Sequence, residues 1–427
     1  MSRLFFRQSR RRRTCQTNRL FSAAEHAEER VLLSAAPIDG AGNNVDHPEW
    51  GSTGETFLRL ATTDYGDGIF SVGGEDRPSA REISNAISDS GGEDIISQRL
   101  LSAMIYAWGQ FIDHDIDLSR EATVPEMAPI GIPAGDPAFD PTGTGAQSMM
   151  FVRSGYDAAT GTDVPREQVN EITAFLDASM VYGSDAERAA ALRADGGYLK
   201  VSDGDMLPYN DGSQGNAGDN GAVSYLAGDV RANENVELTS MHTLFVREHN
   251  RLVDALSEEH PDWDAERLFQ EAKAIVEGEI QAITYNEFLP LLLGQDALAA
   301  YDGYKADVDP QIANIFATAA FRFGHSMLSS TLLRVAEDGS ESAYGHLALR
   351  DAFFQPDRLA NEGGIDDLLR GAAAGTSQTI DTHLVEDVRS FLFGAPGSGG
   401  LDLEALNIQR GRDHGLPDYN TVRSAYG

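Results

Sequence analysis

The sequence predicts a mainly α-helical protein, with a single large helical domain, long loops and little β structure. Apolar residues recur at three- and four-residue steps in several stretches, which is the spacing of one face of a helix. Segments that alternate apolar and polar residues, as strands do, are few and brief. No clear linker divides the chain after residue 50. We therefore expect a basic leader over residues 1–44 and one helical domain over residues 45–427.

Four stretches show the helical spacing. Residues 239–256 are the clearest case, and a second helix follows them, for which Asp262 is the expected N-cap. Residues 95–116 and 312–328 show the same pattern. Long polar connections separate the helices, at residues 125–145, 203–221 and 395–400. Loops this long inside a domain often carry function.

Composition excludes several classes of protein. Of the 427 residues, 41% are hydrophobic, which is enough for a large core. The formal net charge of -34 disfavours nucleic acid as a partner, because an acidic surface repels phosphate. No apolar run reaches the roughly 18 residues that a membrane span needs. Cys15 is the single cysteine, so an internal disulfide is excluded.

The leader differs in charge from the rest of the chain. Residues 1–30 contain eight arginines and three glutamates. The run AEERVLLSA at residues 27–35 is similar to the "LE-x-R-x-LLSA" element of large exported bacterial surface proteins. This similarity predicts a bacterial protein that is exported to the cell surface or the medium, and we expect the leader itself to be disordered. The alternative is a short amphipathic helix without an address function.

The first chemical motif is WGQFIDHDID, which begins at residue 108. On a helix, Gln110, Asp113 and His114 share one face, and this combination is typical of acid–base chemistry. Asp115 points about 100° away around the axis and is free to serve another site. A solvated acidic turn beside a core histidine remains the alternative at this point.

A second motif, TAFLDAS, offers oxygen ligands at alternate positions. Thr173, Asp177 and Ser179 carry oxygens, and Phe175 between them has a backbone carbonyl. Alternate residues of an extended loop face one side, and hard cations such as calcium take six to eight oxygens. A turn rich in Ser and Thr is the alternative.

Three further motifs carry arginine and histidine. Arg231 precedes Glu234 by three residues, and Arg322 precedes His325 by three at the end of an apolar stretch. The run LNIQRGRDHG, which begins at residue 406, is too densely charged for an ordinary surface turn. Taken singly, these motifs can also be explained without a functional site, by a histidine that is hydrogen-bonded inside the core and by a network of Arg–Asp pairs.

Together the motifs resemble those of the animal-type haem peroxidases, the peroxidase–cyclooxygenase superfamily. The resemblance covers about residues 45–425 and keeps the family order of motifs. It is carried by GQFIDHD, ANENVELTSMHTLFVREHNRL, AFRFGH and LNIQRGRDHGLPDYN. It implies haem b as cofactor, hydrogen peroxide as oxidant, and a ferryl haem intermediate that oxidises a second substrate.

The resemblance implies roles for the residues on the distal side of the haem. His114 would move the proton of peroxide, Arg231 would stabilise the developing negative charge, and Gln110 would position water or a halide. Asp113 and Glu234 match the positions at which the family forms ester bonds to haem methyl groups.

The resemblance also implies a proximal side and a calcium site. His325 would bind the haem iron, with Asn407 accepting the other ring N–H. Arg322 and Arg410 match positions near the haem propionates. The calcium ligands would be Asp115, Thr173, Phe175, Asp177 and Ser179.

Differences from the family pattern narrow the expected electron donors and the expected activity. Asn235 stands where a methionine of myeloperoxidase is linked to haem, so no such bond is expected. We therefore expect donors that are easier to oxidise than chloride, namely bromide, iodide, thiocyanate or small phenols. Arg322 occupies the position of the radical-forming tyrosine of cyclooxygenases, which disfavours a fatty-acid dioxygenase. Family domains continue beyond the point that matches Gly427, so a C-terminal truncation is expected. A catalytically silent surface or adhesion module is the remaining alternative.

Overall fold

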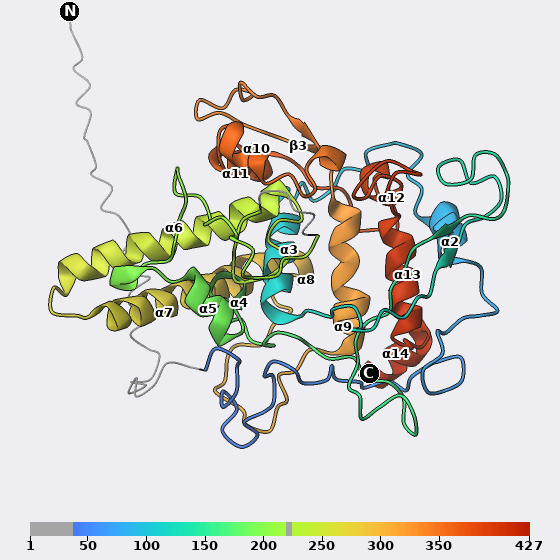
Figure 1. Cartoon of the computed structure of the whole chain (residues 1–427), viewed down its shortest axis with the longest axis horizontal. Helices are drawn as coiled ribbons and strands as arrows, with labels where there is room; N and C mark the ends of the chain where they lie inside the picture. Colours follow the sequence, from blue (N-terminus) through green and yellow to red (C-terminus); the bar gives the residue numbers. More distant parts are fainter. Residues whose placement is uncertain (1–36, 219–223) are drawn as a thin grey trace, which may run out of the picture. The chain divides into compact units, whose positions relative to one another are not determined.

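Helices dominate the computed structural model, which describes residues 37–218 and 224–427 (Figure 1). The longer helices are α2 (Ala80–Ile87), α3 (Met104–Ile116), α5 (Ala186–Leu192), α6 (Val236–Glu259), α7 (Ala265–Ile283), α11 (Asp366–Ala374), α13 (Leu403–Asp413) and α14 (Tyr419–Tyr426). Shorter ones are α4 (Ser179–Tyr182), α8 (Leu289–Leu293), α9 (Asn314–Thr318), α10 (Asp357–Asn361) and α12 (Glu386–Arg389). The predicted mainly α fold is confirmed.

Tight helical turns and two small ladders complete these elements. The 3₁₀ segments are η1 (Asp195–Gly197), η3 (Ala320–Met327) and η4 (Leu349–Asp351), and η2 (Thr284–Phe288) is a π-helical turn. Strand β1 (Ile130–Gly131) pairs antiparallel with β2 (Ser148–Met149), so that Ile130 lies opposite Met149. Strand β3 (Thr331–Leu332) pairs in the same way with β4 (Leu347–Ala348).

Residues 37–218 and 224–427 belong to one compact unit. Residues 37–44, which the sequence assigned to the leader, belong to this unit, and buried Asn44 donates its Nδ2 to the carbonyl of Ala306 at 3.0 Å. The export-type run at residues 27–35 lies outside the described residues. Among the residues that the structure describes, no helix is long and apolar enough to cross a membrane.

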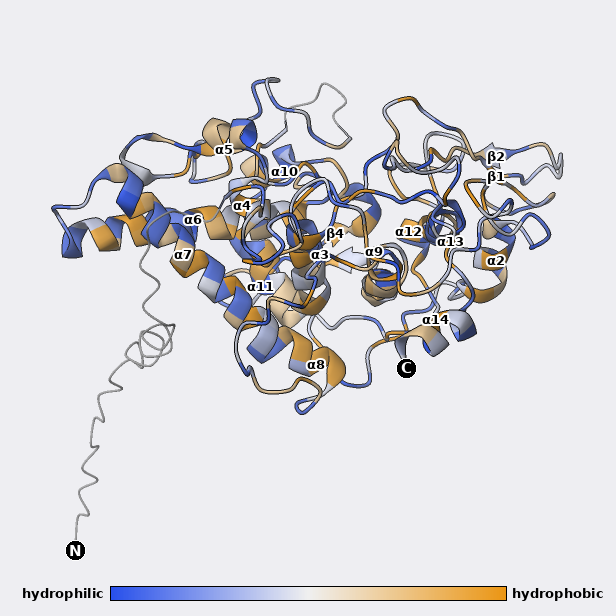
Figure 2. Cartoon of the chain, turned by 90° about the horizontal axis from the view of Figure 1, so that it is seen from below, coloured by the Kyte–Doolittle hydropathy of each residue, from blue (hydrophilic) through white to orange (hydrophobic). Residues whose placement is uncertain are grey.

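The longest helices, α6 and α7, pack against each other and confirm the periodicity read from the sequence. Apolar and polar residues alternate along both of them in Figure 2. Asn235 caps α6 by accepting a hydrogen bond from the N–H of Leu238 at 2.8 Å. The cap of α7 is Asp264 rather than the predicted Asp262, because the Asp264 side chain accepts from the N–H of Arg267.

Two predicted helices are shorter than expected. Residues 95–103 do not join α3; Leu100 has a left-handed φ of 53°, and Ser102 bridges to Thr376 in an extended pairing. The predicted helix at 312–328 is broken at Ala319, whose φ and ψ of -135° and -59° are not helical. The break separates α9 from η3, which carries His325.

Helix α3 is central to the core. Phe111 is fully buried, and its ring stacks on that of Phe245 of α6 with centroids 5.1 Å apart. Trp108 packs against the same ring at 5.8 Å. Burying aromatic side chains of this size contributes about 1.5–3 kcal/mol each. This packing fixes α3 against α6 and so fixes the side chains on its other face.

A buried ion-pair network joins α2 to α13. Arg81 is fully buried, and its guanidinium bonds to Asp136 and to Asp402, each at 2.7 Å. Removing one member would leave a buried charge without a partner, which costs several kcal/mol. The network therefore holds α13 in place, and α13 carries Asn407 and Arg410.

Candidate active site

A cavity of about 550 Å³ lies between α3, the start of α6, η3 and α13. His114 and His325 both line it, and they come from α3 and η3, which pack against each other. Its apolar wall includes Ile105, Phe321, Leu328, Leu349, Phe353, Val388, Leu392, Phe393, Leu401, Leu403 and Leu406. A mostly apolar cavity with a few polar side chains is typical of a cofactor site.

His114 is buried, and its two ring nitrogens have different surroundings. Nδ1 is fully buried without a hydrogen-bond partner and lies 3.5 Å from Oδ1 of Asp229, a residue that does not line the cavity. Burial, followed by the positive charge of Arg231, lowers the pKa of His114 well below 6.5. The ring is therefore neutral at pH 7, as a proton acceptor must be.

Arg231 is held beside His114 by Asp229. The carboxylate accepts from Nε and from Nη2 of Arg231, each at 2.9 Å, and from its backbone N–H at 2.7 Å. Nη2 also donates to the carbonyl of Asp117 at 2.8 Å. Although burial opposes the charge of Arg231, the contacts with Asp229 raise its pKa above the ordinary value. The cavity therefore keeps a fixed positive charge next to a neutral imidazole.

Gln110, Glu234 and Asn235 form a chain of hydrogen bonds at the same wall. Gln110 donates to Glu234 at 3.1 Å and accepts from Nδ2 of Asn235 at 3.0 Å. Burial raises the pKa of Glu234 to about 7. Burial also raises the pKa of Asp113, whose Oδ2 lies 3.4 Å from Nη1 of Arg231. The predicted group of Gln110, Asp113 and His114 therefore does face one cavity.

His325 is paired with Asn407, but with the opposite polarity to the one predicted. Nδ2 of Asn407 lies 2.9 Å from Nδ1 of His325, whereas the sequence reading had the asparagine accept a ring N–H. The amide is turned this way because its Oδ1 accepts from Arg322 at 3.0 Å and its Nδ2 donates to Glu404 at 3.2 Å. Burial lowers the pKa of His325 to about 3, so this ring is also neutral.

Arg322 and Arg410 both line the cavity, as expected. Nε of Arg322 is buried and has no hydrogen-bond partner. Nη1 of Arg410 donates to Ser154 at 2.8 Å and to Asp413 at 3.1 Å. A buried donor without a partner is costly, so Arg322 favours an acceptor inside the cavity.

Four of the five residues of the predicted calcium site, all except Phe175, are joined by hydrogen bonds in the structure. Asp115 is fully buried and accepts from the Ser179 hydroxyl at 3.0 Å, while Asp177 accepts from the Thr173 hydroxyl at 2.9 Å. Burial and then the charge of Asp177 raise the pKa of Asp115 well above 3.8. The segment is not the extended loop that was predicted, because Ala178 has a left-handed φ of 60° and turns the chain into α4.

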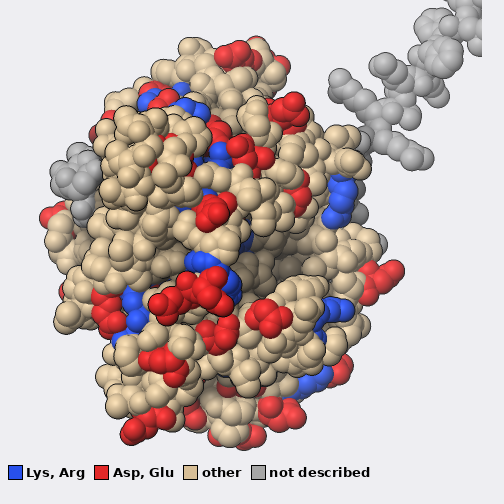
Figure 3. Space-filling view, turned by 90° about the vertical axis from the view of Figure 1, so that its right-hand side faces the viewer, with Lys and Arg blue, Asp and Glu red and all other residues tan. Residues whose placement is uncertain are grey.

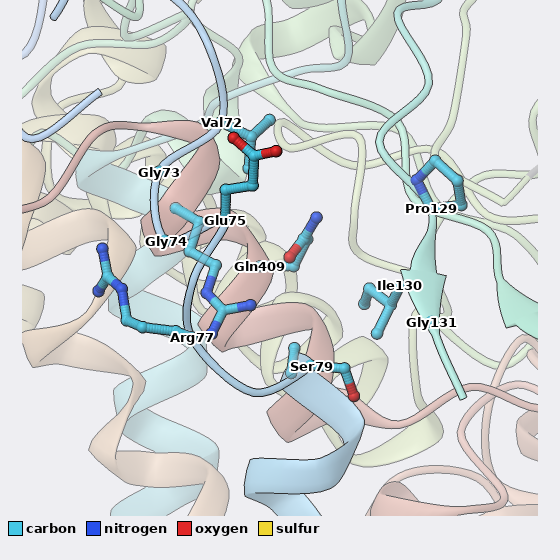
Figure 4. Close-up of a pocket in the computed structure, with 12 residues that line it drawn as sticks. Val72, Gly73, Gly74, Glu75, Arg77, Ser79, Pro129, Ile130, Gly131 and Gln409 are labelled. Carbon is cyan, nitrogen blue, oxygen red and sulfur yellow. The ribbon is translucent and has the colours of Figure 1, made fainter. Parts of the chain in front are cut away.

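A second hollow of about 340 Å³ has a different character. It lies between the loop before α2, strand β1 and α13, and Figure 4 shows Glu75, Arg77 and Gln409 around it. No histidine lines it. On the face shown in Figure 3, basic side chains stand among acidic ones and form no continuous basic patch. The histidine-lined cavity is therefore the candidate active site.

Sequence reasoning missed three buried residues of this region. Asp229 lies next to both His114 and Arg231, His242 has its ring centroid 6.2 Å from that of His114, and His414 lines the cavity. His242 and His414 belong to the quoted motifs, and Asp229 lies three residues before one of them. The pairing of Asp229 with His114 joins segments far apart in the chain, and only the fold shows it.

Comparisons with known proteins agree with the fold and the cavity. The animal haem peroxidase family profile matches residues 35–427. Peroxidasin of Drosophila melanogaster is 38% identical over 432 residues, which cover 90% of this chain and 28% of the peroxidasin. This chain thus spans less than a third of that relative.

Solved structures give the same result. Peroxidase A from Dictyostelium discoideum superposes with a TM-score of 0.84 and 35% identity, covering 92% of this chain and 78% of the other. A fatty acid alpha-dioxygenase of Arabidopsis thaliana superposes with a TM-score of 0.72, covering 92% of this chain and 64% of the other, and its 18% identity shows a shared fold alone. The chain belongs to the animal haem peroxidase family.

Proposed function

We propose that this protein is a haem peroxidase, which reduces hydrogen peroxide and oxidises a small donor. The observation that carries the proposal is one apolar cavity lined by two neutral histidines from different elements, with Arg231 beside one of them. Family membership supports the same activity. A fatty-acid dioxygenase is not favoured, because Arg322 stands where those enzymes place a radical-forming tyrosine.

The residues of the cavity fit haem. A flat apolar ring matches the aliphatic and aromatic wall, and the partnerless Nε of Arg322 suits a haem propionate. Arg410 also lines the cavity and would be a second arginine for the haem propionates. Bound haem would supply the redox centre, which peroxide oxidises and the donor then reduces. His325 would hold the iron.

On the other side of the cavity, His114 would accept the first proton of peroxide and return it to the leaving oxygen. This role requires a neutral ring with a free Nε2, and burial keeps the ring neutral. Arg231 would stabilise the negative charge that develops on that oxygen, because its guanidinium is fixed by Asp229 before the reaction begins.

Asn407 would support His325 through its oxygen. An iron bond at Nε2 of His325 leaves the proton on Nδ1, and only Oδ1 of Asn407 can accept it. In the structure that oxygen is engaged by Arg322. A propionate that binds Arg322 would release this oxygen, and rotation of the amide would then bring Oδ1, in place of Nδ2, to face Nδ1 of His325.

Donor choice follows from Asn235. This side chain caps α6 and bonds to Gln110, and it cannot form the link that a methionine makes to haem. We therefore propose bromide, iodide, thiocyanate and small phenols as donors, and we propose export to the cell surface or the medium on the basis of residues 27–35.

The activity is tested by adding haem to the purified full chain and recording its spectrum. We expect a Soret band and oxidation of a phenolic dye that depends on peroxide, followed by turnover in a panel of halides. Haem binding without turnover of any donor would support the silent surface module instead.

We expect haem to become covalently attached after exposure to peroxide. Asp113 and Glu234 both line the cavity, and each ester would join a carboxyl oxygen to a haem methyl carbon. Each bond forms with the loss of two electrons and two protons, one from the methyl C–H and one from the carboxyl O–H, and one hydrogen peroxide accepts all of them and becomes two water molecules. Acid–acetone extraction should then leave haem on the protein, and the double variant Asp113→Asn, Glu234→Gln should release all of it. Complete extraction from the unaltered protein would contradict the linkage.

We propose that calcium occupies the site of Asp115 and Asp177. A fully buried carboxylate, Asp115, and a partly buried one, Asp177, each with a hydroxyl neighbour, fit a hard cation, and calcium beside Asp115 would fix the helix that carries His114. In the described residues no group of three or more acidic, histidine or cysteine side chains is arranged around a metal position. The hydroxyls of Thr173 and Ser179 and the carbonyl of Phe175 would supply the remaining ligands.

Calcium at a hundredfold excess over its Kd should stabilise the protein by about 2.7 kcal/mol. Thermal unfolding with calcium, magnesium and EGTA measures this. Asp115→Asn should abolish the calcium effect, whereas Asp211→Asn, at an exposed loop position, should keep it. An equal response of both variants to calcium would rule out the site.

A further inference from the structure

The group nearest to the buried ring nitrogen of His114, Nδ1, is a hydrogen-bond acceptor. Among the described residues, Oδ1 of Asp229 is the acceptor that lies beside Nδ1 of His114, at 3.5 Å. Nδ1 is fully buried and makes no hydrogen bond within the described structure. Hydrogen bonds in an active site are often long before the cofactor and substrate are bound, and they shorten afterwards.

His242 adds to this environment. Its Nδ1 lies 3.1 Å from the carbonyl of Met180, and a carbonyl only accepts, so this nitrogen carries the proton. Nε2 of His242 is then a bare acceptor, and it is buried without a partner. The ring lies 6.2 Å from that of His114, centroid to centroid, and it offers no donor to His114.

The hydrogen-bond donors near Asp229 belong to Arg231 and already bond to the Asp229 carboxylate. The backbone N–H and Nε of Arg231 both point at Oδ1, and Nη2 points at Oδ2. Asp229 is buried, and the charge of Arg231 keeps its pKa below the ordinary value. A permanent carboxylate therefore faces the inner nitrogen of His114.

From this geometry we propose that Asp229 is a positioning residue that holds His114 in the Nδ1–H tautomer. The lone pair is then on Nε2, the nitrogen left for the cavity, where the proton of peroxide has to be accepted. The same carboxylate aligns Arg231, so one side chain sets both groups. The consequence for peroxide reduction rests on the proposed function, whereas the tautomer itself does not.

Two substitutions separate this role from a structural one. Asp229→Ala removes the acceptor, and an imidazole without a directing partner favours the Nε2–H form. Asp229→Asn keeps an acceptor at the Oδ1 position, because two donors of Arg231 point there and only one points at Oδ2. Loss of folding support alone would not change the tautomer.

The experiment is NMR of the full chain labelled with ¹⁵N-histidine, with the signal of His114 assigned through His114→Ala. We expect the Nδ1–H form in the unaltered protein and in Asp229→Asn, and the Nε2–H form in Asp229→Ala. Asp387→Asn is the matched control, because Asp387 is also a buried carboxylate paired with an arginine, Arg350, whose own side chain reaches solvent, and it should leave the signal unchanged.

The rate of reaction with peroxide in the haem-loaded chain gives a second readout. Asp229→Ala should lower it by about 100-fold or more, within the range of general acid–base catalysis. Asp229→Asn should lower it by at most about tenfold, because a neutral acceptor replaces a charged one. An Nε2–H form in the unaltered protein, or an Nδ1–H form that survives in Asp229→Ala, would overturn the proposal even if peroxidase activity is confirmed.

Discussion

His114→Ala should lower the rate of the reaction with peroxide by about 10²–10⁴-fold, the range expected when a general acid–base is removed. The buried ring is neutral, and Nδ1 lies beside Asp229, a residue that does not line the cavity, so Nε2 is available there as the acceptor. Stopped-flow mixing of the haem-loaded protein with peroxide measures the rate directly. Haem affinity should change little, because the iron bond is assigned to His325.

A matched control is His383→Ala. This histidine lies on a loop, its side chain is 40% exposed, and it pairs with Asp381. The peroxide rate of this variant should equal that of the unaltered protein. If His114→Ala kept the full rate, the assignment of the proton acceptor would be wrong.

His325→Ala should weaken haem binding by at least about 100-fold. Loss of a residue that merely bonds to a metal ligand already costs about 10–100-fold in affinity, and His325 is the ligand itself. Haem titration followed through the Soret band measures the Kd. Added imidazole should occupy the vacated space and restore both the band and part of the affinity.

The companion variant Asn407→Ala tests the support of that ligand. Its side chain bonds to His325, Arg322 and Glu404, so its loss should fall in the lower range of about 10–100-fold. An unchanged haem Kd in His325→Ala would show that the iron is bound elsewhere.

Periodicity predicted the helical fold, and the length and order of the motifs predicted the residues of the cavity. The break at Ala319 was not predictable, because apolar residues continue through it at helical spacing and only the local backbone departs from the helix. The start of α3 at Met104 depends on extended pairing with residues near Thr376, which are distant in sequence.

The sequence predicted the positions of the site residues better than the directions of their hydrogen bonds. The orientation of Asn407 depends on Arg322 and Glu404, which compete for its amide, and a sequence motif does not record that competition. Asp229 precedes Arg231 by two residues, but its proximity to His114 follows from the packing of α3 against the start of α6. Contacts of this kind require the fold.

The central claim is that haem lies between two histidines from separate elements. X-ray diffraction from crystals of the haem-loaded chain, measured at the iron absorption edge, locates the iron directly. We expect one iron peak inside the cavity, bonded to Nε2 of His325, with His114 on the opposite side of the ring. Iron bonded to His114, or iron found outside this cavity, would contradict it.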